Sequence, residues 1–294
     1  MSKTTVWLLC IVVACAVTFQ WLTAPDAPPA TPGGDRNIAN GETVFNIAGC
    51  ASCHSASEAE GDAKLVLAGG QRFPTEFGTF VAPNISPDVE QGIGGWSEAE
   101  FLNAVLNGVS PEGEHYYPAF PYASYIRMTV ADAADLWTYI QTLPASDEPS
   151  QPSEVGFPFS FRRGLGLWKL LHMKTGVIQK ADQEDPVLAR GRYLVEGPGH
   201  CGECHTPRDV TGGMILNNWL YGGPSPDGPG RIPALAGPAS KMDEWSEVDI
   251  AEYLRSGFTP DYDSAGGAMV GVIDNTAKLS DEDRKAIAAY LKAL

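Results

Sequence analysis

The chain has 294 residues, with 36 acidic against 20 basic side chains, which gives a formal net charge of −16. That length is enough for about two domains, and the strong negative charge disfavours binding to nucleic acid, whose phosphates it would repel. The charge suits either docking against a basic face of a partner protein or simple solubility.

The N-terminal segment is an apolar run from Val6 to Leu22, interrupted by only two polar residues. The run is longer than most signal-peptide cores and slightly short for a spanning helix. We expect residues 1–23 to be an uncleaved membrane anchor, with Lys3 left in the cytoplasm. A cleaved signal peptide and a lipoprotein modified at Cys15 are the alternatives. All three topologies export the body of the chain, and residues 24–35 follow as a stiff proline-rich tether.

Residues 36–144 are expected to form a first helical unit. Its landmarks in chain order are a helix at Gly41–Phe45, the motif Cys50-Ala-Ser-Cys53-His54, the loop Ala82–Ile85, an amphipathic stretch from Trp96 to Gly108 and a last helix from Thr129 to Leu143. The serine after Trp96 and the acidic residues behind it are a helix start signal, and Gly108 is a stop signal. The loops show little of the alternation that would indicate strands.

Residues 145–181 are expected to be a linker. The segment begins with polar sequence rich in helix breakers and continues with two apolar stretches, Phe157–Phe161 and Leu165–Leu171. A free linker would not need these side chains, so we expect it to pack across both units. An exposed partner-binding patch is the alternative.

The first unit is then repeated in residues 182–294. The matching landmarks are Gly191–Val195, Cys201-Gly-Glu-Cys204-His205, Ile232–Leu235, the stretch from Trp245 to Gly257 and a last helix from Ser280 to Leu294. Thr129 and Ser280 each precede an aspartate by three residues, which predicts a capping box at the last helix of each unit. We therefore predict an all-α chain of two tandem, loop-rich domains.

The motif Cys-x-x-Cys-His occurs once in each unit and is the attachment signature of c-type haem. Residues i and i+3 of a helical turn face the same way, so both cysteines could form thioethers with one porphyrin edge. The histidine that follows supplies a neutral imidazole nitrogen to iron. We predict two covalent haem c groups, held by Cys50, Cys53 and His54 and by Cys201, Cys204 and His205.

Three other uses of paired cysteines explain the sequence less well. A structural zinc site gathers its ligands within a few tens of residues, whereas the two motifs lie in different units. A thioredoxin-like redox site needs a βαβ setting that is not visible here. Disulfides are the ordinary use of cysteine in an exported chain, but they do not account for the histidine behind each pair.

The sixth ligand of an electron-transfer c-haem is usually a methionine opposite the histidine. The second unit offers Met214, Met242 and Met269, and we predict Met269, which lies in a glycine-rich loop before the last helix. In the first unit we predict Met128, because no other methionine lies between Met1 and Met173. Core packing is the ordinary role of any single methionine. His115 competes with Met128 and would give a bis-histidine haem of lower potential.

The ligating histidines also need partners for their second ring nitrogen, because that hydrogen bond fixes the tautomer. The carbonyl oxygens of Pro83 and Pro233, or of their neighbours, are the candidates. Proline has no N–H of its own, which commonly leaves its carbonyl available for such a bond.

With these motifs the chain resembles membrane-associated dihaem cytochromes c of bacteria. It is similar to the cytochrome c subunits that serve membrane dehydrogenases for alcohols, gluconate and fructose. The stretches that carry the resemblance are Ala82–Asp88, Gly94–Ser97, Tyr116–Tyr122, Tyr125–Thr129 and Asn275–Asp283. The resemblance implies that each unit is a class I cytochrome c domain with His/Met iron. The chain departs from those subunits in having two haem units rather than three, and in carrying its apolar segment at the other end.

We therefore predict a dihaem electron carrier on the periplasmic side of the bacterial inner membrane, held there by its N-terminal anchor, or soluble in the periplasm if the segment is cleaved. It would take electrons from a dehydrogenase or a quinol-oxidising complex and pass them to a downstream cytochrome or terminal oxidase. No catalytic residue is required for this role. The alternatives are the cytochrome subunit of a multi-subunit dehydrogenase and a haem enzyme such as a dihaem peroxidase. A peroxidase needs an open iron position, which the candidate sixth ligands disfavour.

Overall fold

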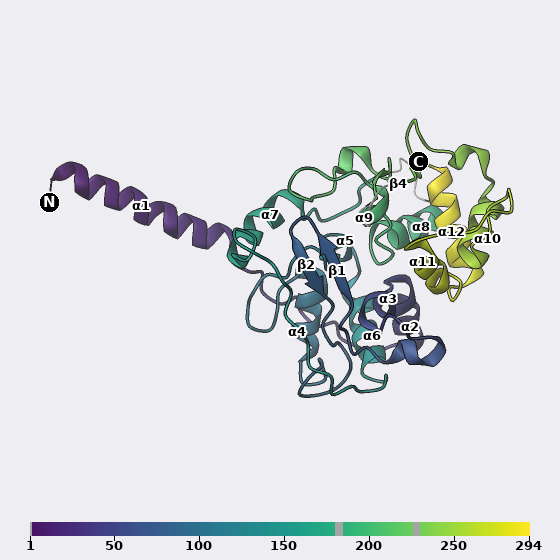
Figure 1. Cartoon of the computed structure of the whole chain (residues 1–294), viewed down its shortest axis with the longest axis horizontal. Helices are drawn as coiled ribbons and strands as arrows, with labels where there is room; N and C mark the ends of the chain where they lie inside the picture. The colour runs from purple at the N-terminus through teal and green to yellow at the C-terminus, as the bar shows by residue number, and fades with distance from the viewer. Residues whose placement is uncertain (1, 180–184, 226–229) are drawn as a thin grey trace.

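The computed structural model describes residues 2–179, 185–225 and 230–294. A rounded body carries one long helix that projects from it, with the N-terminus at the far tip (Figure 1). The α-helices are α1 (Lys3–Leu22), α2 (Ile38–Ile47), α3 (Cys50–His54), α4 (Glu98–Leu102), α5 (Tyr122–Tyr125), α6 (Val130–Ile140), α7 (Leu165–His172), α8 (Pro186–Glu196), α9 (Gly202–His205), α10 (Glu247–Ser256), α11 (Met269–Thr276) and α12 (Asp281–Lys292). Further short helical segments are Gly61–Leu65, Asn103–Asn107, Arg162–Gly164, Leu216–Asn218 and Met242–Glu244.

Each domain is built on one pair of crossing helices, α2 with α6 in the first and α8 with α12 in the second. A glycine lies at each crossing. A Cβ atom on Gly41 would overlap the carbonyl oxygen of Asp135, and one on Gly191 would overlap that of Ala286. The absence of a side chain at these two positions therefore permits the close approach of each helix pair.

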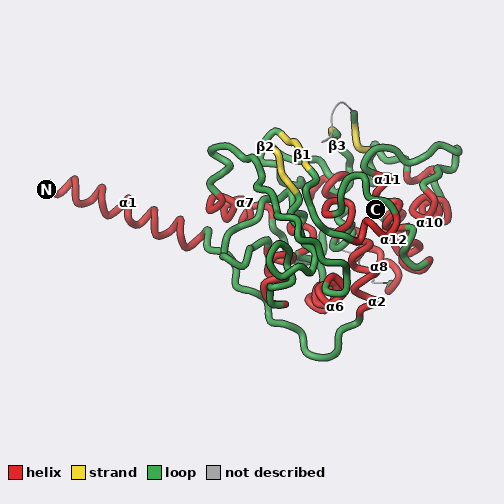
Figure 2. Tube along the Cα trace, turned by 60° about the horizontal axis from the view of Figure 1, so that its bottom comes forward, coloured by secondary structure: helices red, strands yellow, loops and turns green. Residues whose placement is uncertain are grey.

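Two short antiparallel hairpins accompany the helices, so the prediction of an all-α chain is wrong in this detail. They pair β1 (Arg72–Thr75) with β2 (Gly78–Val81) and β3 (Gly223–Pro224) with β4 (Arg231–Ile232). Figure 2 shows how small a share of the body they occupy beside loops and helices. Strands of two to four residues are too short to show a period of two in the sequence.

The helix boundaries largely follow the capping signals. Ser97 and Ser246 each form a reciprocal capping box at the start of α4 and α10, and the left-handed residues Gly108 and Gly257 end the two helical stretches. Capping boxes were also predicted at α6 and α12, but only half of each forms, and at α12 the carboxylate of Asp283 accepts from Arg190. The hydroxyl of Thr129 accepts from the backbone N–H three residues later, whereas the backbone N–H of Thr129 donates to the hydroxyl of Tyr193.

The linker contacts both domains, but mainly through hydrogen bonds, and most of the apolar side chains that were expected to pack there are exposed. Its residue Glu154 pairs with Thr79 at the edge of the first hairpin, and the amide of Asn84 donates to two linker carbonyls. On the other side, the indole N–H of Trp168 donates to the carbonyl of Thr211 at 3.0 Å. The linker therefore joins the two domains through hydrogen bonds as well as through the chain.

Helix α1 is the one helix in the described part of the chain that is long and apolar enough to cross a membrane. It has no buried residue, and it leaves the body as an isolated rod in both views (Figures 1 and 2). Length and composition alone do not separate a membrane anchor from a signal sequence, because both have them.

Candidate functional site

The two Cys-x-x-Cys-His motifs fold as single helical turns. Gly49, with a φ of 63°, turns the chain into α3, and His200, with a φ of 39°, precedes α9 and its motif. In both motifs the first cysteine is half-buried and the second is exposed. Cysteines three apart on one turn lie on the same face of it, which is the arrangement that two bonds to one ligand edge require.

Each motif histidine is held by a proline carbonyl. The Nδ1 atom of His54 lies 2.8 Å from the carbonyl oxygen of Pro83, and that of His205 lies 2.8 Å from the carbonyl oxygen of Pro233. A carbonyl only accepts, so Nδ1 carries the hydrogen and Nε2 keeps its lone pair for a metal. The hydrogen-bond partners predicted from the sequence are thus confirmed in both domains.

One glycine supports each of these contacts, and neither was among the residues predicted for the site. The backbone N–H of Gly69 donates to the carbonyl of His54, and that of Gly222 to the carbonyl of His205, both at 2.7 Å. Both glycines have positive φ, 76° and 72°, and a Cβ on Gly69 would overlap the backbone of Pro83. The signal for them was the Gly-Gly dipeptide that follows each motif at a similar distance.

The electrostatics suit neutral histidines and un-ionised thiols. Burial lowers the pKa of His54 and of His205, against the opposing effect of the proline carbonyls. Burial also raises the pKa of the Cys50 and Cys201 thiols to about 12. A redox-active dithiol depends on a lowered thiol pKa, so the thioredoxin-like alternative does not fit these cysteines.

The structure has no disulfide among the residues that it describes. In the same residues, no group of three or more His, Cys, Asp or Glu side chains is arranged to hold a metal ion. The cysteines and histidine of each motif therefore do not converge on one point, as a zinc site would require. They fit a group that bonds both thiols at its edge and takes the imidazole at its centre.

The candidate methionines lie in different surroundings. Met128 is 4% exposed and belongs to the core of the first domain, against which Cys50 also packs. Met269 is half-buried, begins α11 and packs at the edge of the second core, as Cys201 does. Each thioether thus shares a core with the motif of its own domain.

His115, the competitor of Met128, is used elsewhere. It is 3% exposed, and its Nε2 atom lies 2.9 Å from the carbonyl oxygen of Thr23, the residue that follows α1. Lys169 and Arg163 are its charged neighbours and lower its pKa, after burial as the larger cause. This hydrogen bond ties the end of α1 to the body and favours Met128 as the sixth ligand of the first domain.

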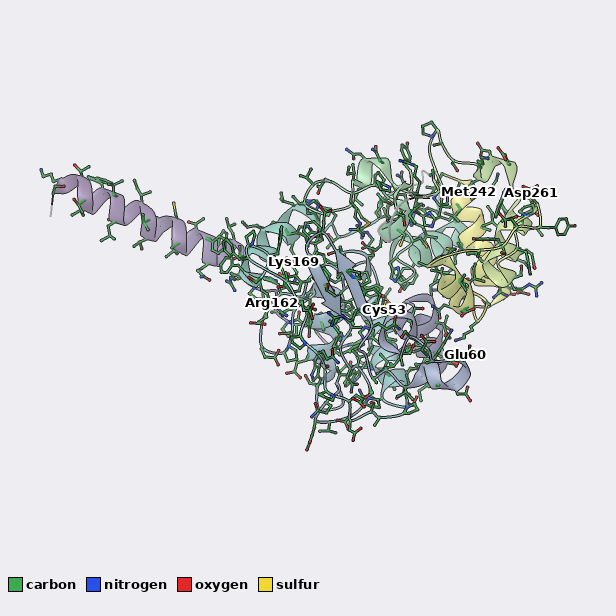
Figure 3. The ribbon with its side chains drawn as sticks, in the orientation of Figure 1. Cys53, Glu60, Arg162, Lys169, Met242 and Asp261 are labelled. Atoms are coloured by element: carbon green, nitrogen blue, oxygen red, sulfur yellow. The ribbon has the colours of Figure 1, made fainter. Side chains whose placement is uncertain are left out.

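The two motifs face each other across the domain boundary. The amide of Asn275 donates to the hydroxyl of Ser52 at 2.8 Å, and the hydroxyl of Ser124 donates to Glu203 at 2.7 Å. The pKa of Cys53 is raised by desolvation from the surrounding protein atoms, although the residue is partly open to solvent, and the nearby thiol of Cys204 raises it further. Figure 3 places Cys53 at the centre of the body, between the two groups of helices. The two motifs therefore lie on facing sides of the same domain boundary.

Comparison with known proteins identifies the same two units. The cytochrome c family profile matches residues 38–144 and again residues 188–294. A protein from Cereibacter sphaeroides described as "Diheme cytochrome c-type" is 53% identical over 97% of this chain and 95% of its own length. The gluconate 2-dehydrogenase cytochrome c subunit of Pantoea cypripedii is 37% identical over 88% of the chain, and the fructose dehydrogenase cytochrome subunit of Gluconobacter japonicus is 34% identical over 92%. The chain spans 60% and 55% of the length of these two subunits.

Proposed function

The chain belongs to the cytochrome c family and is a dihaem cytochrome with two covalently bound haem c groups, and from this premise we propose that it relays electrons from a membrane dehydrogenase to a downstream cytochrome or terminal oxidase. When bound, haem c supplies an iron that cycles between the ferrous and ferric states. The observation that carries the proposal is the repeated imidazole–carbonyl contact of 2.8 Å in both domains. It leaves one nitrogen of each histidine for iron and holds the ring in one orientation.

The site residues bind and orient the haem groups and do not themselves react with a substrate. We assign Cys50, Cys53, Cys201 and Cys204 to the thioether bonds, and His54 and His205 to one face of each iron. Met128 and Met269 would supply the second iron ligand of each domain, where a weakly donating thioether would raise the potential. With His and Met both holding the iron, no further residue of the chain would be needed for electron transfer.

The donor follows from the relatives and not from a docking site on this chain. Two of them are cytochrome subunits of gluconate and fructose dehydrogenases, which supports a dehydrogenase as the source of electrons. The Cereibacter relative, which matches over almost its entire length, is described only as a dihaem cytochrome, so we keep a separate carrier and a fixed subunit as the two forms of the proposal. Solubilisation in mild detergent followed by affinity purification separates the two: a stoichiometric dehydrogenase would support a subunit, and its absence would support a carrier.

We further propose that α1 is an uncleaved anchor that keeps the body on the periplasmic side of the inner membrane. Its 20 apolar-rich residues match the length of a spanning helix, and Lys3 at its start favours a cytoplasmic N-terminus. The native protein should then resist extraction from membranes by alkaline carbonate and begin at or near Met1. A soluble protein that begins between residues 24 and 36 would show cleavage, and a lipid-modified Cys15 as first residue would show a lipoprotein.

A further inference from the structure

Helix α7 exposes its leucines and buries its lysine, which is the reverse of the usual arrangement in a surface helix of a soluble domain. Its residues Gly166 and Lys169 are buried, whereas Leu167, Leu170 and Leu171 are 42%, 53% and 63% exposed. Positions i, i+3 and i+4 form one continuous face of a helix. A surface helix usually turns such an apolar face toward the core and its charges toward water, so these leucines need another explanation.

The buried face of α7 is held by specific contacts that fix its orientation. The ammonium group of Lys169 donates to the carbonyl oxygens of Asn107 and Gly108 at 2.5 and 2.8 Å. These carbonyls end the helical stretch that begins at Glu98, where a cation is favourable. Gly166 lies against Thr23 with no room for a Cβ atom. The leucines therefore face outward because the opposite face is occupied, and the helix has no freedom to rotate them inward.

The outward face lies where α1 enters the body. The guanidinium group of Arg163 donates to the carbonyl of Gln20 at 2.6 Å and to the hydroxyl of Thr23 at 2.9 Å. The rings of Phe19 and Phe161 stack at 6.1 Å between centroids. Figures 1 and 2 both show α7 beside the end of α1, and Figure 3 places Arg162 and Lys169 there.

Three exposed phenylalanines precede α7 in the same segment, of which Phe161 stacks on Phe19 of α1 and Phe159 contacts Phe77. Phe157 is 89% exposed, and Phe159 and Phe161 are 47% and 55% exposed. With the leucines they form a surface that we call the interfacial patch: Phe157, Phe159, Phe161, Leu167, Leu170 and Leu171. Exposed aromatic and leucine side chains in one patch are typical of a helix that lies in the surface layer of a bilayer.

The charge of this segment is opposite to that of the rest of the chain. Between Glu154 and Asp182 there is no acidic residue, and five basic residues occur, in a chain of net charge −16: Arg162, Arg163, Lys169, Lys174 and Lys180. Basic side chains beside an apolar patch favour anionic lipid headgroups. Lys169 is buried on the opposite face of α7, so the charge near the patch comes from the half-buried Arg162 and Arg163 and the exposed Lys174.

We propose that the interfacial patch lies in the surface layer of the bilayer that α1 spans, so that the body is held against the membrane at two places. The occupant is lipid and not protein, because the patch is continuous with the end of a membrane-spanning helix and carries the charge that anionic lipid attracts. This inference rests on the proposed anchoring by α1. It gives the two domains a fixed orientation, with α10–α12 on the side of the body away from α1 (Figure 1).

The test is photo-crosslinking of the full-length holoprotein to lipid. The photoreactive residue p-benzoylphenylalanine replaces Leu170, and the protein is reconstituted into vesicles of phosphatidylethanolamine and phosphatidylglycerol. Replacement of Val13 in α1 reports on the anchor, and replacement of Val248, which is 76% exposed on α10, is the matched control. We expect lipid adducts at 170 at least about fivefold above those at 248, because buried apolar area sets interfacial binding.

The outcomes separate the two proposals. Adducts at 13 without adducts at 170 overturn the interfacial patch and leave the anchor intact. Adducts at 170 without adducts at 13 support the patch and overturn the anchor. Adducts at neither position overturn both, and adducts at 170 to a second copy of the chain overturn lipid as the occupant.

Substitutions of the neighbouring leucines, with the photoreactive probe kept at 170, test whether the patch itself and not the bulk of the probe brings position 170 to the lipid. Leu167→Gln combined with Leu171→Gln should lower the lipid adducts at 170 by about twofold or more, with the haem absorption spectrum unchanged. Val248→Gln should change neither. Vesicles of phosphatidylcholine alone should also give fewer adducts at 170, since they lack the anionic headgroups. An adduct yield at 170 that stays the same after both the leucine substitutions and the change of lipid would contradict the proposal.

Discussion

The two haem domains are alike on one side of the proposed iron and different on the other. On the histidine side, the imidazole contacts a proline carbonyl at 2.8 Å in both, and a glycine N–H holds the histidine carbonyl at 2.7 Å in both. On the methionine side, Met128 is deep in a core and Met269 begins a helix at a core edge. Two thioethers and one imidazole would constrain the first side, whereas the proposed second ligand is a single sulfur atom, which places fewer demands on the surrounding structure.

The difference between the methionines bears on the direction of electron flow. A more buried iron site disfavours the more charged ferric state and raises the potential. The 4% exposure of Met128 therefore predicts the higher potential for the first domain. Electrons that enter through the second domain would then move toward the first, nearer to α1.

The largest expected effect comes from removing a thioether. Cys53→Ser should leave the first domain with a poorly held haem and largely unfolded, while the second domain keeps its own; Cys204→Ser should do the reverse. Each motif's first cysteine packs against the core of its own domain, so loss of the attached haem should act mainly on that domain. Mass spectrometry should find one haem per chain in place of two. Cys10→Ser in α1 is the control and should retain both; two haems in Cys53→Ser would contradict the assignment.

The methionine substitutions test the methionine side of each proposed iron site, where the two domains differ. Met128→Ala and Met269→Ala should each open one iron, make it competent to bind carbon monoxide, and lower its potential by on the order of 100 mV, within the ~0.8 V that axial ligands span. A redox titration of the parent should resolve two potentials, the higher of them lost in Met128→Ala. If His115→Ala opens an iron and Met128→Ala does not, the first haem is bis-histidine.

Substitutions at the helix crossings test a feature that the two domains share. Gly41→Ala and Gly191→Ala should each destabilise one domain by about 1–3 kcal/mol, the cost of inserting a methyl group where the partner helix leaves no room. Denaturant unfolding followed by the absorption of each haem would measure it. Gly266→Ala, which meets nothing within 4 Å, should stay within about 0.5 kcal/mol of the parent. Equal effects at all three positions would refute the close-packed crossings.

A smaller effect of pH should appear only where the linker meets the first domain. Burial lowers the pKa of Lys169 to about 8, against 10.5 in the unfolded chain. Between these values the unfolded state binds more protons, so stability rises with pH from about 8 toward 10.5 and is lost as pH falls through 8. The free energy of unfolding should increase by up to about 2 kcal/mol between pH 7 and pH 9.5. In Lys169→Met this increase should disappear; a parent protein that loses stability over the same range would contradict the prediction.

Local signals in the sequence predicted most of what surrounds the histidines. The motif, the proline carbonyls and the serine caps at Ser97 and Ser246 depend on neighbours close in the chain, and the structure has them. The missed features depend on distant partners. The Asp132 side chain bonds Asn40 and Tyr193 and does not complete a cap. Likewise, the orientation of α7 is set by Lys169 reaching Gly108, which no periodicity reveals.

The most direct test of the central claim is the near-infrared spectrum of the ferric full-length protein. Two irons with histidine on one face and methionine on the other should both be low-spin and show the sulfur-to-iron band at the intensity of two haems. Met128→Ala and Met269→Ala should each remove half of it. A high-spin haem in the parent protein, together with turnover of peroxide, would contradict the electron-carrier account and support the haem enzyme in its place.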